Sequence, residues 1–126
     1  MADATVPGEG APAGGGAGAA KAVMVQIKWV ANPFRGDKFD EAWRPNAEAV
    51  LDYGATWWAF LRASEGRLDF TQLALFHDKL DFDRYWYSEE IAEARALASG
   101  LFQVPVLPTY HEISGIGEFA PSGAAP

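Results

Sequence analysis

The stretch from Arg67 to Gly100 constrains the fold most, because its apolar pattern changes period partway along. Residues 68–77 alternate in the manner of a β-strand, yet both faces that this alternation creates are largely apolar. A strand with one face in water has a polar side, so this strand should be covered on both sides. From Asp81, the expected N-cap, to Gly100 the apolar residues recur at helical spacing, with a second start signal at Ser88. We therefore expect a strand followed by one interrupted helix or by two short helices in line.

Two more strands and a helix precede this stretch. Residues 22–31 and 56–63 alternate as strands, and residues 37–54 carry apolar side chains at helical spacing up to a terminal glycine. Asp37 is the expected cap of this helix, and Pro45 predicts a helix that begins near Arg44 or is kinked there.

A hairpin turn in the middle of the chain and an edge strand near its end complete the pattern. Residues 64–66 form a short polar connection between two strand patterns, which predicts a β-hairpin. The last strand pattern, residues 105–114, contains two prolines, and prolines suit a sheet edge. The predicted order is βαββαβ. This is the ferredoxin-like α+β fold, a four-stranded antiparallel sheet with two helices on one face.

The sheet face away from the helices then needs a cover. We expect it to carry aromatic side chains, and an exposed patch of that size is unusual on a monomer. A second copy of the same sheet would cover it, giving a homodimer with a barrel-like interior, a dimeric α/β barrel. The aromatic residues expected there are Trp58, Phe60, Phe70 and Phe76.

Composition divides the 126 residues into one domain and two tails. Residues 22–119 hold all the aromatic side chains and form the expected domain, while residues 1–21 and 120–126 are rich in Ala, Gly and Pro. Such segments bury too little apolar surface to fold alone, so we expect flexible tails, the first of which could instead order on a protein partner. No segment has the pattern of a secretory signal or a membrane span. The absence of cysteine fits a cytoplasmic protein.

Charge and motif spacing exclude several function classes. The net charge is −7 and no Lys or Arg cluster occurs, which argues against a nucleic-acid partner. Only two histidines are present, and no HxH or HExxH spacing accompanies them, so we expect no metal and no cofactor.

Several passages resemble known families. The passage LALFHDKLDFDRYWYSEEI and the closing PTYHEI resemble the dimeric α/β-barrel superfamily, which includes antibiotic-biosynthesis monooxygenases, EthD-type and NIPSNAP-type proteins and polyketide cyclases. The end of the chain is also similar to darcynin-like proteins. The resemblance implies a cofactor-independent enzyme of secondary metabolism that acts on a hydrophobic aromatic or polyketide-like molecule. Haem-degrading members and barrel cyclases often have a histidine near the second helix, which this chain lacks between Lys79 and Gly100.

Three residues are candidate catalytic groups. His77 and His111 end or lie within predicted strands, and histidine is the usual general base near neutral pH. Arg62 or Lys28 could stabilise an enolate in the same site. The alternatives are histidines that are simply hydrogen-bonded or exposed, and cations whose charged ends reach water from strand ends.

Polar residues embedded in apolar strands suggest a small-molecule site. Gln26, Lys28, Arg62 and Gln72 should share their faces with the four strand aromatics, and an aromatic cavity with a few polar groups is a typical ligand pocket. Trp86 belongs to an aromatic run on the second helix, which either packs in the core and at a dimer contact or meets a ligand. The predicted substrate-binding residues are Lys28, Trp58, Phe60, Phe70, Gln72, Phe76 and Trp86.

Two functions fit these observations. One is a small dimeric enzyme, a cofactor-independent oxygenase or cyclase with a hydrophobic substrate. The other is a non-catalytic dimeric module that binds a small ligand or stabilises a larger assembly.

Overall fold

The structure, a computed structural model, describes residues 22–118, and the two expected tails lie outside this range. Four strands, three α-helices and one 3-10 helix make up the described chain. In chain order they are β1 (Val23–Val30), α1 (Gly36–Glu48), η1 (Ala49–Tyr53), β2 (Ala55–Arg62), β3 (Asp69–Phe76), α2 (Lys79–Trp86), α3 (Glu89–Leu97) and β4 (Thr109–Glu112).

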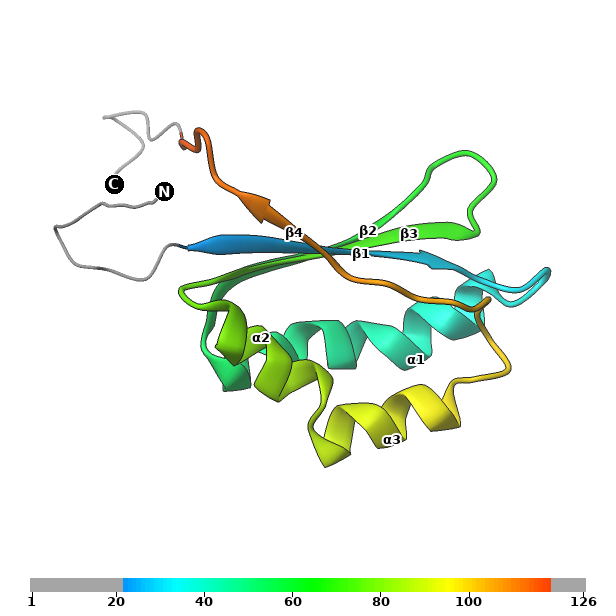
Figure 1. Cartoon of the computed structure of the whole chain (residues 1–126). Coiled ribbons are helices and arrows are strands. Elements are labelled where there is room, and N and C mark those ends of the chain that lie inside the picture. The colour runs from blue at the N-terminus through cyan, green and yellow to red at the C-terminus, as the bar shows by residue number, and fades with distance from the viewer. Residues whose placement is uncertain (1–21, 119–126) are drawn as a thin grey trace, which may run out of the picture.

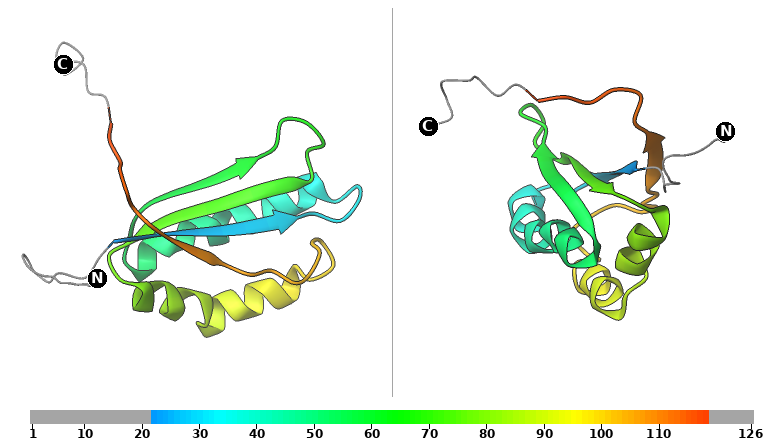
Figure 2. Two further views of the ribbon diagram at one scale, coloured as in Figure 1. Left: turned by 45° about the horizontal axis from the view of Figure 1, so that its top comes forward. Right: turned by 90° about the vertical axis from the view of Figure 1, so that its left-hand side faces the viewer.

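The strands form one antiparallel sheet in the order β2-β3-β1-β4, and the helices cover one face of it. Figure 1 shows the helices as a layer beneath the sheet, and Figure 2 shows the segment after β4, residues 113–118, rising above the opposite face. The predicted α+β ferredoxin-like architecture is therefore confirmed, with β4 at a sheet edge as expected. The second helical stretch is the predicted pair of short helices.

The strand register decides which side chains meet the helices. Trp29 pairs with Phe70, and Phe60 pairs with Gln72, so these residues share one face of the sheet. That face packs on Phe39, Trp43 and Val50 of the first helical segments and on Phe82, Tyr85 and Ile91 of the last two helices. The hydrophobic core therefore lies wholly on the helix side, where burying aromatic surface supplies most of the favourable free energy of folding.

Helix starts agree with the sequence only in part. Ser88 caps α3 by accepting a hydrogen bond from the backbone N–H of Ile91, as predicted. The cap of α2 is Asp78, which accepts from Leu80 N–H, so the expected cap at Asp81 is wrong by one turn. Asp81 lies in the first turn, where its carboxylate still interacts favourably with the positive end of the helix dipole.

The first helix also departs from expectation at its start. It begins at Gly36 and contains Pro45, so the expected start near Arg44 is wrong. Asp37 is not its cap, because it is already inside the first turn and its carboxylate pairs with Arg62 instead. The missing N–H of one proline is tolerated because Phe39 and Trp43 anchor the helix in the core.

The face away from the helices, here called the open face, consists of cross-strand rows. One row runs Trp57, Leu75, Met24, His111 from β2 to β4, and the next runs Ala59, Leu73, Gln26, Thr109. Much of it is apolar and accessible: Trp57 is 45% exposed, and Leu61, one row further along, is 51% exposed. The sheet is thus apolar on both faces, as the sequence predicts, and within residues 22–118 only one face is layered with helices.

Substitution of Gly54 tests the junction between η1 and β2. Gly54 has a φ of +99°, and an added Cβ would lie 3.1 Å from the Asp81 carboxylate. Gly54→Ala should therefore lower the free energy of unfolding by about 1–3 kcal/mol, as measured by urea denaturation. Gly100→Ala is the matched control, because a Cβ there meets no atom within 4 Å, and it should leave stability nearly unchanged. Equal stability of the two variants would contradict this account of the junction.

Candidate functional site

The predicted cavity residues divide between the two sides of the sheet. Phe70 and Phe76 are buried in the helix-side core, and Trp58 and Phe60 pack against it. The expectation that these four aromatics cover the exposed face is therefore wrong. Lys28 pairs with Thr71 on the open face, so it cannot share a site with them. The physical reason is that both faces of each strand are apolar, and their alternation alone does not say which one the helices choose.

Gln72 is the polar centre of the helix-side core. Its Oε1 accepts hydrogen bonds from the indole N–H groups of Trp29 at 3.0 Å and Trp43 at 2.9 Å. Its Nε2 donates to the Tyr85 hydroxyl at 3.1 Å, which in turn donates to the Asn46 carbonyl at 2.7 Å. With 1% of its surface exposed, Gln72 satisfies the polar groups of three aromatic side chains from one strand and two helices. A bound molecule would have to break this network to reach the amide.

Tyr85 stays neutral in this environment. Burial raises the pKa of its hydroxyl above the usual value of 10.0, and the hydrogen bond from Gln72 acts in the opposite direction with smaller effect. A neutral hydroxyl keeps its proton for the Asn46 carbonyl, so the Gln72 network is a structural one.

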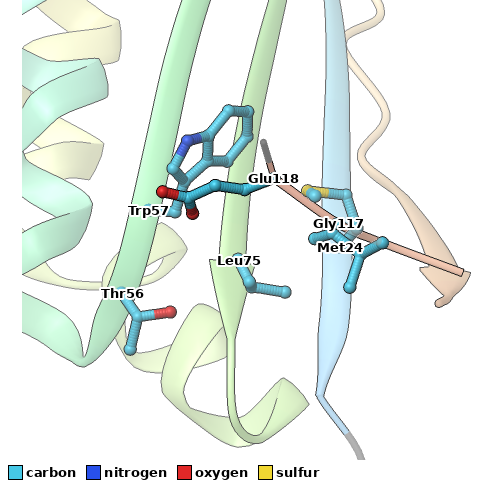
Figure 3. Close-up of a pocket in the computed structure, with 7 residues that line it drawn as sticks. Met24, Thr56, Trp57, Leu75, Gly117 and Glu118 are labelled. Atoms are coloured by element: carbon cyan, nitrogen blue, oxygen red, sulfur yellow. The ribbon is translucent and has the colours of Figure 1, made fainter. Parts of the chain in front are cut away.

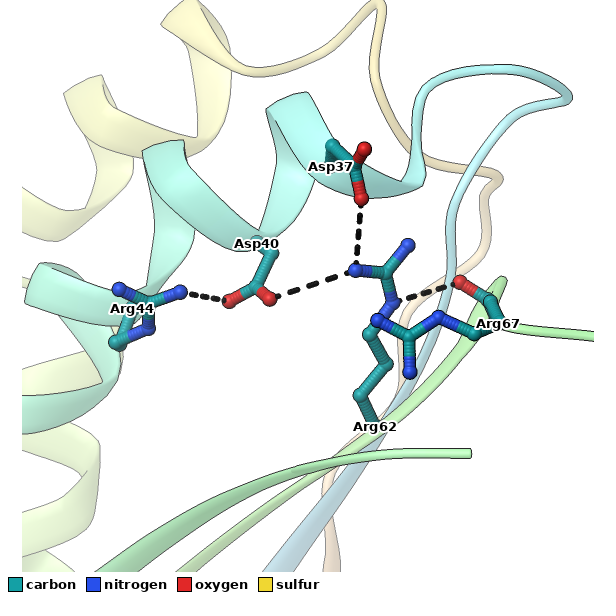
Figure 4. A network of polar contacts seen from close by, with 5 residues as sticks. All are labelled: Asp37, Asp40, Arg44, Arg62 and Arg67. Atoms are coloured by element: carbon teal, nitrogen blue, oxygen red, sulfur yellow. Dashed lines mark hydrogen bonds and ion pairs between the residues drawn. The ribbon is translucent and has the colours of Figure 1, made fainter. Parts of the chain in front are cut away.

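Arg62 lies at the rim of the helix side, where its charge is already compensated. Its Nη1 is 2.9 Å from Asp37 and 3.6 Å from Asp40, and its Nε donates to the backbone carbonyl of Arg67 at 2.9 Å (Figure 4). The guanidinium also lies 5.1 Å from the centre of the Phe70 ring. These contacts tie the β2–β3 hairpin to the start of α1. An enolate at Arg62 would have to compete with two carboxylates.

The two histidines lie on different strands near one end of the sheet, since Val23 pairs with both Phe76 and Glu112, whereas Arg62 pairs with Phe70 near the other end. His77 follows β3 and is exposed just before α2. His111 lies on β4 opposite Met24, on the open face, and its Nε2 is 3.2 Å from the hydroxyl oxygen of Thr109. The structure therefore does not bring the two histidines and Arg62 together in one site.

An apolar recess crosses the open face beside His111. Its floor is Met24, Leu75 and Trp57, three members of the row that ends in His111, and its volume is about 650 Å³. The segment after β4 passes over it and adds further walls (Figure 3). The complete lining is Met24, Thr56, Trp57, Leu75, Ile116, Gly117 and Glu118.

The hydrogen bonds of Thr109 determine which nitrogen of His111 carries the proton. The Thr109 hydroxyl is 3.2 Å from the Gln26 carbonyl, which can only accept, so the hydroxyl donates there. Its single proton being used, the hydroxyl must accept from His111 Nε2–H. The lone pair of neutral His111 is then on Nδ1, which is free to accept a proton. The strand register thus places a possible general base opposite Met24, one position beyond the residues that line the recess.

The recess was not foreseen from the sequence. Trp57 is not among the predicted substrate-binding residues, and no role is predicted for residues 116–118. The signal was present in the alternation of 56–63, because Trp57, Ala59 and Leu61 form an apolar side of their own. The register that aligns this side with His111 depends on a bulge at Thr56, between the pairs Ala55–Phe76 and Trp57–Leu75, and a bulge is not visible in composition.

Trp86 is buried in the core beside Phe82 and Trp29, at ring-centre distances of 5.8 and 6.1 Å. Within residues 22–118 no three His, Asp or Glu side chains gather where they could hold a metal ion. Over the same residues, none of the helices combines the length and apolar character needed to cross a bilayer.

Comparison with known proteins identifies the fold. No protein-family model and no curated protein matches this chain, whereas solved structures do. SnoaB, a cofactor-independent oxygenase from Streptomyces nogalater, is similar with a TM-score of 0.66 and 12% identity over 77% of this chain and 97% of its own. A Nitrosomonas europaea protein described as a putative antibiotic biosynthesis monooxygenase has a TM-score of 0.67 and 12% identity, over 75% of this chain and 92% of its own. PA3566 from Pseudomonas aeruginosa has a TM-score of 0.66 and 11% identity, over 75% of this chain and 96% of its own.

These neighbours confirm the predicted resemblance at the level of the fold. At 11–12% identity the likeness extends to the ferredoxin-like architecture and carries no residue roles.

Replacing Gln72 tests whether its network is structural. Gln72→Met leaves two buried indole N–H groups without an acceptor, and each unsatisfied buried donor costs about 1–3 kcal/mol. The variant should therefore unfold with a free energy lower by about 2–5 kcal/mol, measured by urea denaturation.

Gln26→Met is the matched control. Gln26 lies half-buried on the open face, and within residues 22–118 its side chain makes no hydrogen bond. The control should change stability by less than about 0.5 kcal/mol. A Gln72→Met protein as stable as the control would contradict the structural role.

Proposed function

We propose that this protein is a homodimeric, cofactor-independent oxygenase, or a cyclase using the same proton transfer, that acts on a hydrophobic aromatic or polyketide-like molecule. The observation that carries the proposal is the row Trp57, Leu75, Met24, His111, in which the first three residues line an apolar recess and the imidazole of His111 is the next side chain along the same face. The fold that the chain shares with SnoaB supports the reaction class.

The open face supports the homodimer. Its rows expose Trp57 and Leu61 beside Leu73 and Leu75, and apolar surface of this extent favours a partner. A second copy related by a two-fold axis would present the same rows to this face. The recess would then lie between two sheets, closed from water.

The chemistry needs a base and a dry site. A substrate held against Trp57 and Met24 would bring an acidic C–H or phenol group towards His111 Nδ1. Removal of that proton gives an electron-rich anion that can react with O₂. For a methylene substrate, one oxygen atom becomes the carbonyl of the product and the other leaves as water with the two methylene hydrogens. Thr109 holds the imidazole in the tautomer that this step requires.

A non-catalytic binding module is the second candidate. It is favoured by the contacts of two polar residues that were expected to act on a substrate. The charge of Arg62 is already neutralised by carboxylates, and the amide of Gln72 is already hydrogen-bonded within the core. In this function the recess would hold a ligand without turnover, and His111 would contribute a hydrogen bond.

The dimer is tested by a charge at the centre of the open face. The wild-type protein should sediment as a dimer at micromolar concentration. Leu73→Lys would bury an unpaired charge at the interface, which costs about 3–5 kcal/mol and should weaken association by roughly 100-fold or more. Leu97→Lys is the matched control, because Leu97 is exposed on α3, and it should remain dimeric. A wild-type monomer at these concentrations would refute the dimer.

Turnover of anthrone, a three-ring aromatic ketone with an acidic methylene, tests the reaction. The wild-type protein should convert anthrone to anthraquinone faster than the uncatalysed reaction does. The rate is measured as oxygen uptake and as the change in absorbance. His111→Gln removes the base and should lower the rate by roughly 100-fold or more. His77→Gln is the matched control and should keep the wild-type rate, because His77 follows β3 and is not a member of the row Trp57, Leu75, Met24, His111. Equal rates for both variants would exclude His111 as the base, and binding without turnover would favour the module.

A further inference from the structure

A second pocket lies on the helix side of the sheet, separate from the open-face recess. Its walls come from the end of α2, from α3 and from the segment that leads to β4, and its volume is about 350 Å³. This volume is at the small end of the range for ligand pockets. The lining residues are Trp86, Arg95, Ala96, Phe102, Val104 and Val106, so one cation stands among apolar and aromatic side chains.

The Arg95 guanidinium is fixed in place by Trp86. Its Cζ lies 4.0 Å from the centre of the Trp86 ring, and its Nη1 donates a hydrogen bond of 2.9 Å to the Trp86 carbonyl. Trp86 is itself 7% exposed and stacked on Phe82, so its ring is a rigid platform. A guanidinium already held over an aromatic ring gives up little side-chain freedom when it binds a further partner.

The charge of Arg95 is only partly solvated, and it lacks an acidic partner among residues 22–118. Burial lowers the pKa of Arg95 below its usual value, and the phenols of Tyr85 and Tyr87 act in the opposite direction. Within residues 22–118 no carboxylate lies within ion-pair distance of it, and its hydrogen bond to Trp86 uses one of five N–H donors.

Arg62 shows how this fold treats a comparable charge. Arg62 and Arg95 are the two half-buried basic side chains of residues 22–118, and the other lysines and arginines in that range are exposed. Arg62 is paired with Asp37 and Asp40. A half-buried cation is costly unless paired, and in a chain of net charge −7 acidic partners are plentiful. The lack of one at Arg95 within residues 22–118 therefore indicates a partner from outside this part of the protein.

We propose that this pocket binds a small planar carboxylic acid with one or two aromatic rings. The carboxylate would take the remaining N–H groups of Arg95 in the two-pronged geometry that guanidinium favours. The rings would lie against Phe102 and Val106, in a space too small for a large polycyclic molecule. The pocket lies across the sheet from His111, so this ligand is a second one, and the proposal does not rest on the proposed oxygenase.

Calorimetric titration with 2-naphthoate and its neutral analogue 2-naphthamide tests the pocket on the full-length protein. The wild-type protein should bind 2-naphthoate at least tenfold more tightly than 2-naphthamide, because only the acid pairs with the guanidinium. Arg95→Met should remove this preference and weaken 2-naphthoate binding at least tenfold. Arg84→Met is the matched control, because Arg84 is exposed on α2 and paired with Asp81, and it should bind as the wild type does.

A second variant keeps the test informative if Arg95→Met fails to fold. Ala96→Phe adds a ring at an exposed position of the pocket wall, so it should leave the circular dichroism spectrum unchanged and abolish 2-naphthoate binding. Equal affinity for the acid and the amide, undiminished binding by Ala96→Phe, or displacement of 2-naphthoate by an equal concentration of inorganic phosphate would each overturn the proposal. Loss of anthrone turnover would not affect it.

Discussion

The Gln72 carboxamide is the interaction on which the rest of the structure depends. Two tryptophans and a tyrosine are buried together between sheet and helices, and each carries a polar hydrogen that an apolar core cannot satisfy. Gln72 accepts from both indoles and donates to the hydroxyl, while Tyr85 passes its own proton to Asn46. One amide thus joins β1, β3, α1 and α2. It also fills the centre of the space between sheet and helices, which leaves no room there for a bound molecule, and the recess beside His111 lies on the other face of the sheet.

The order and type of the elements could be predicted because they depend on local period. Residues 68–77 alternate and residues 81–100 repeat at helical spacing, and neither pattern needs knowledge of the partner. Which face turns inward could not be predicted in the same way. Polar residues occur on both sides of β3, Gln72 on one and Asp69 and Thr71 on the other, so apolar content alone does not decide which face turns inward. The choice depends on Trp43 and Tyr85, which lie 29 and 13 residues from their partner.

The candidate site follows the same division. The identity of His111 as a possible base comes from its residue type, and its usefulness comes from register: four strands align Trp57, Leu75, Met24 and His111 in one row. Arg62 illustrates the opposite outcome. As a lone arginine in an apolar strand it suggests a functional cation, but Asp37 lies 25 residues away in sequence and 2.9 Å away in space. Long-range pairing of this kind decides between a structural and a functional charge, and sequence spacing does not report it.

The two half-buried arginines differ in their charge partners, and this difference bears on function. Both are held against an aromatic ring, Arg62 over Phe70 and Arg95 over Trp86, and both donate to a backbone carbonyl. They differ in that two carboxylates neutralise Arg62 and, within residues 22–118, no carboxylate pairs with Arg95. Since an ion pair at a half-buried site offsets desolvation, a fold selected for stability alone gains from an acid beside Arg95. An unpaired charge at the mouth of an apolar pocket lowers the stability of the free protein. A bound anion would supply the missing partner and offset this cost.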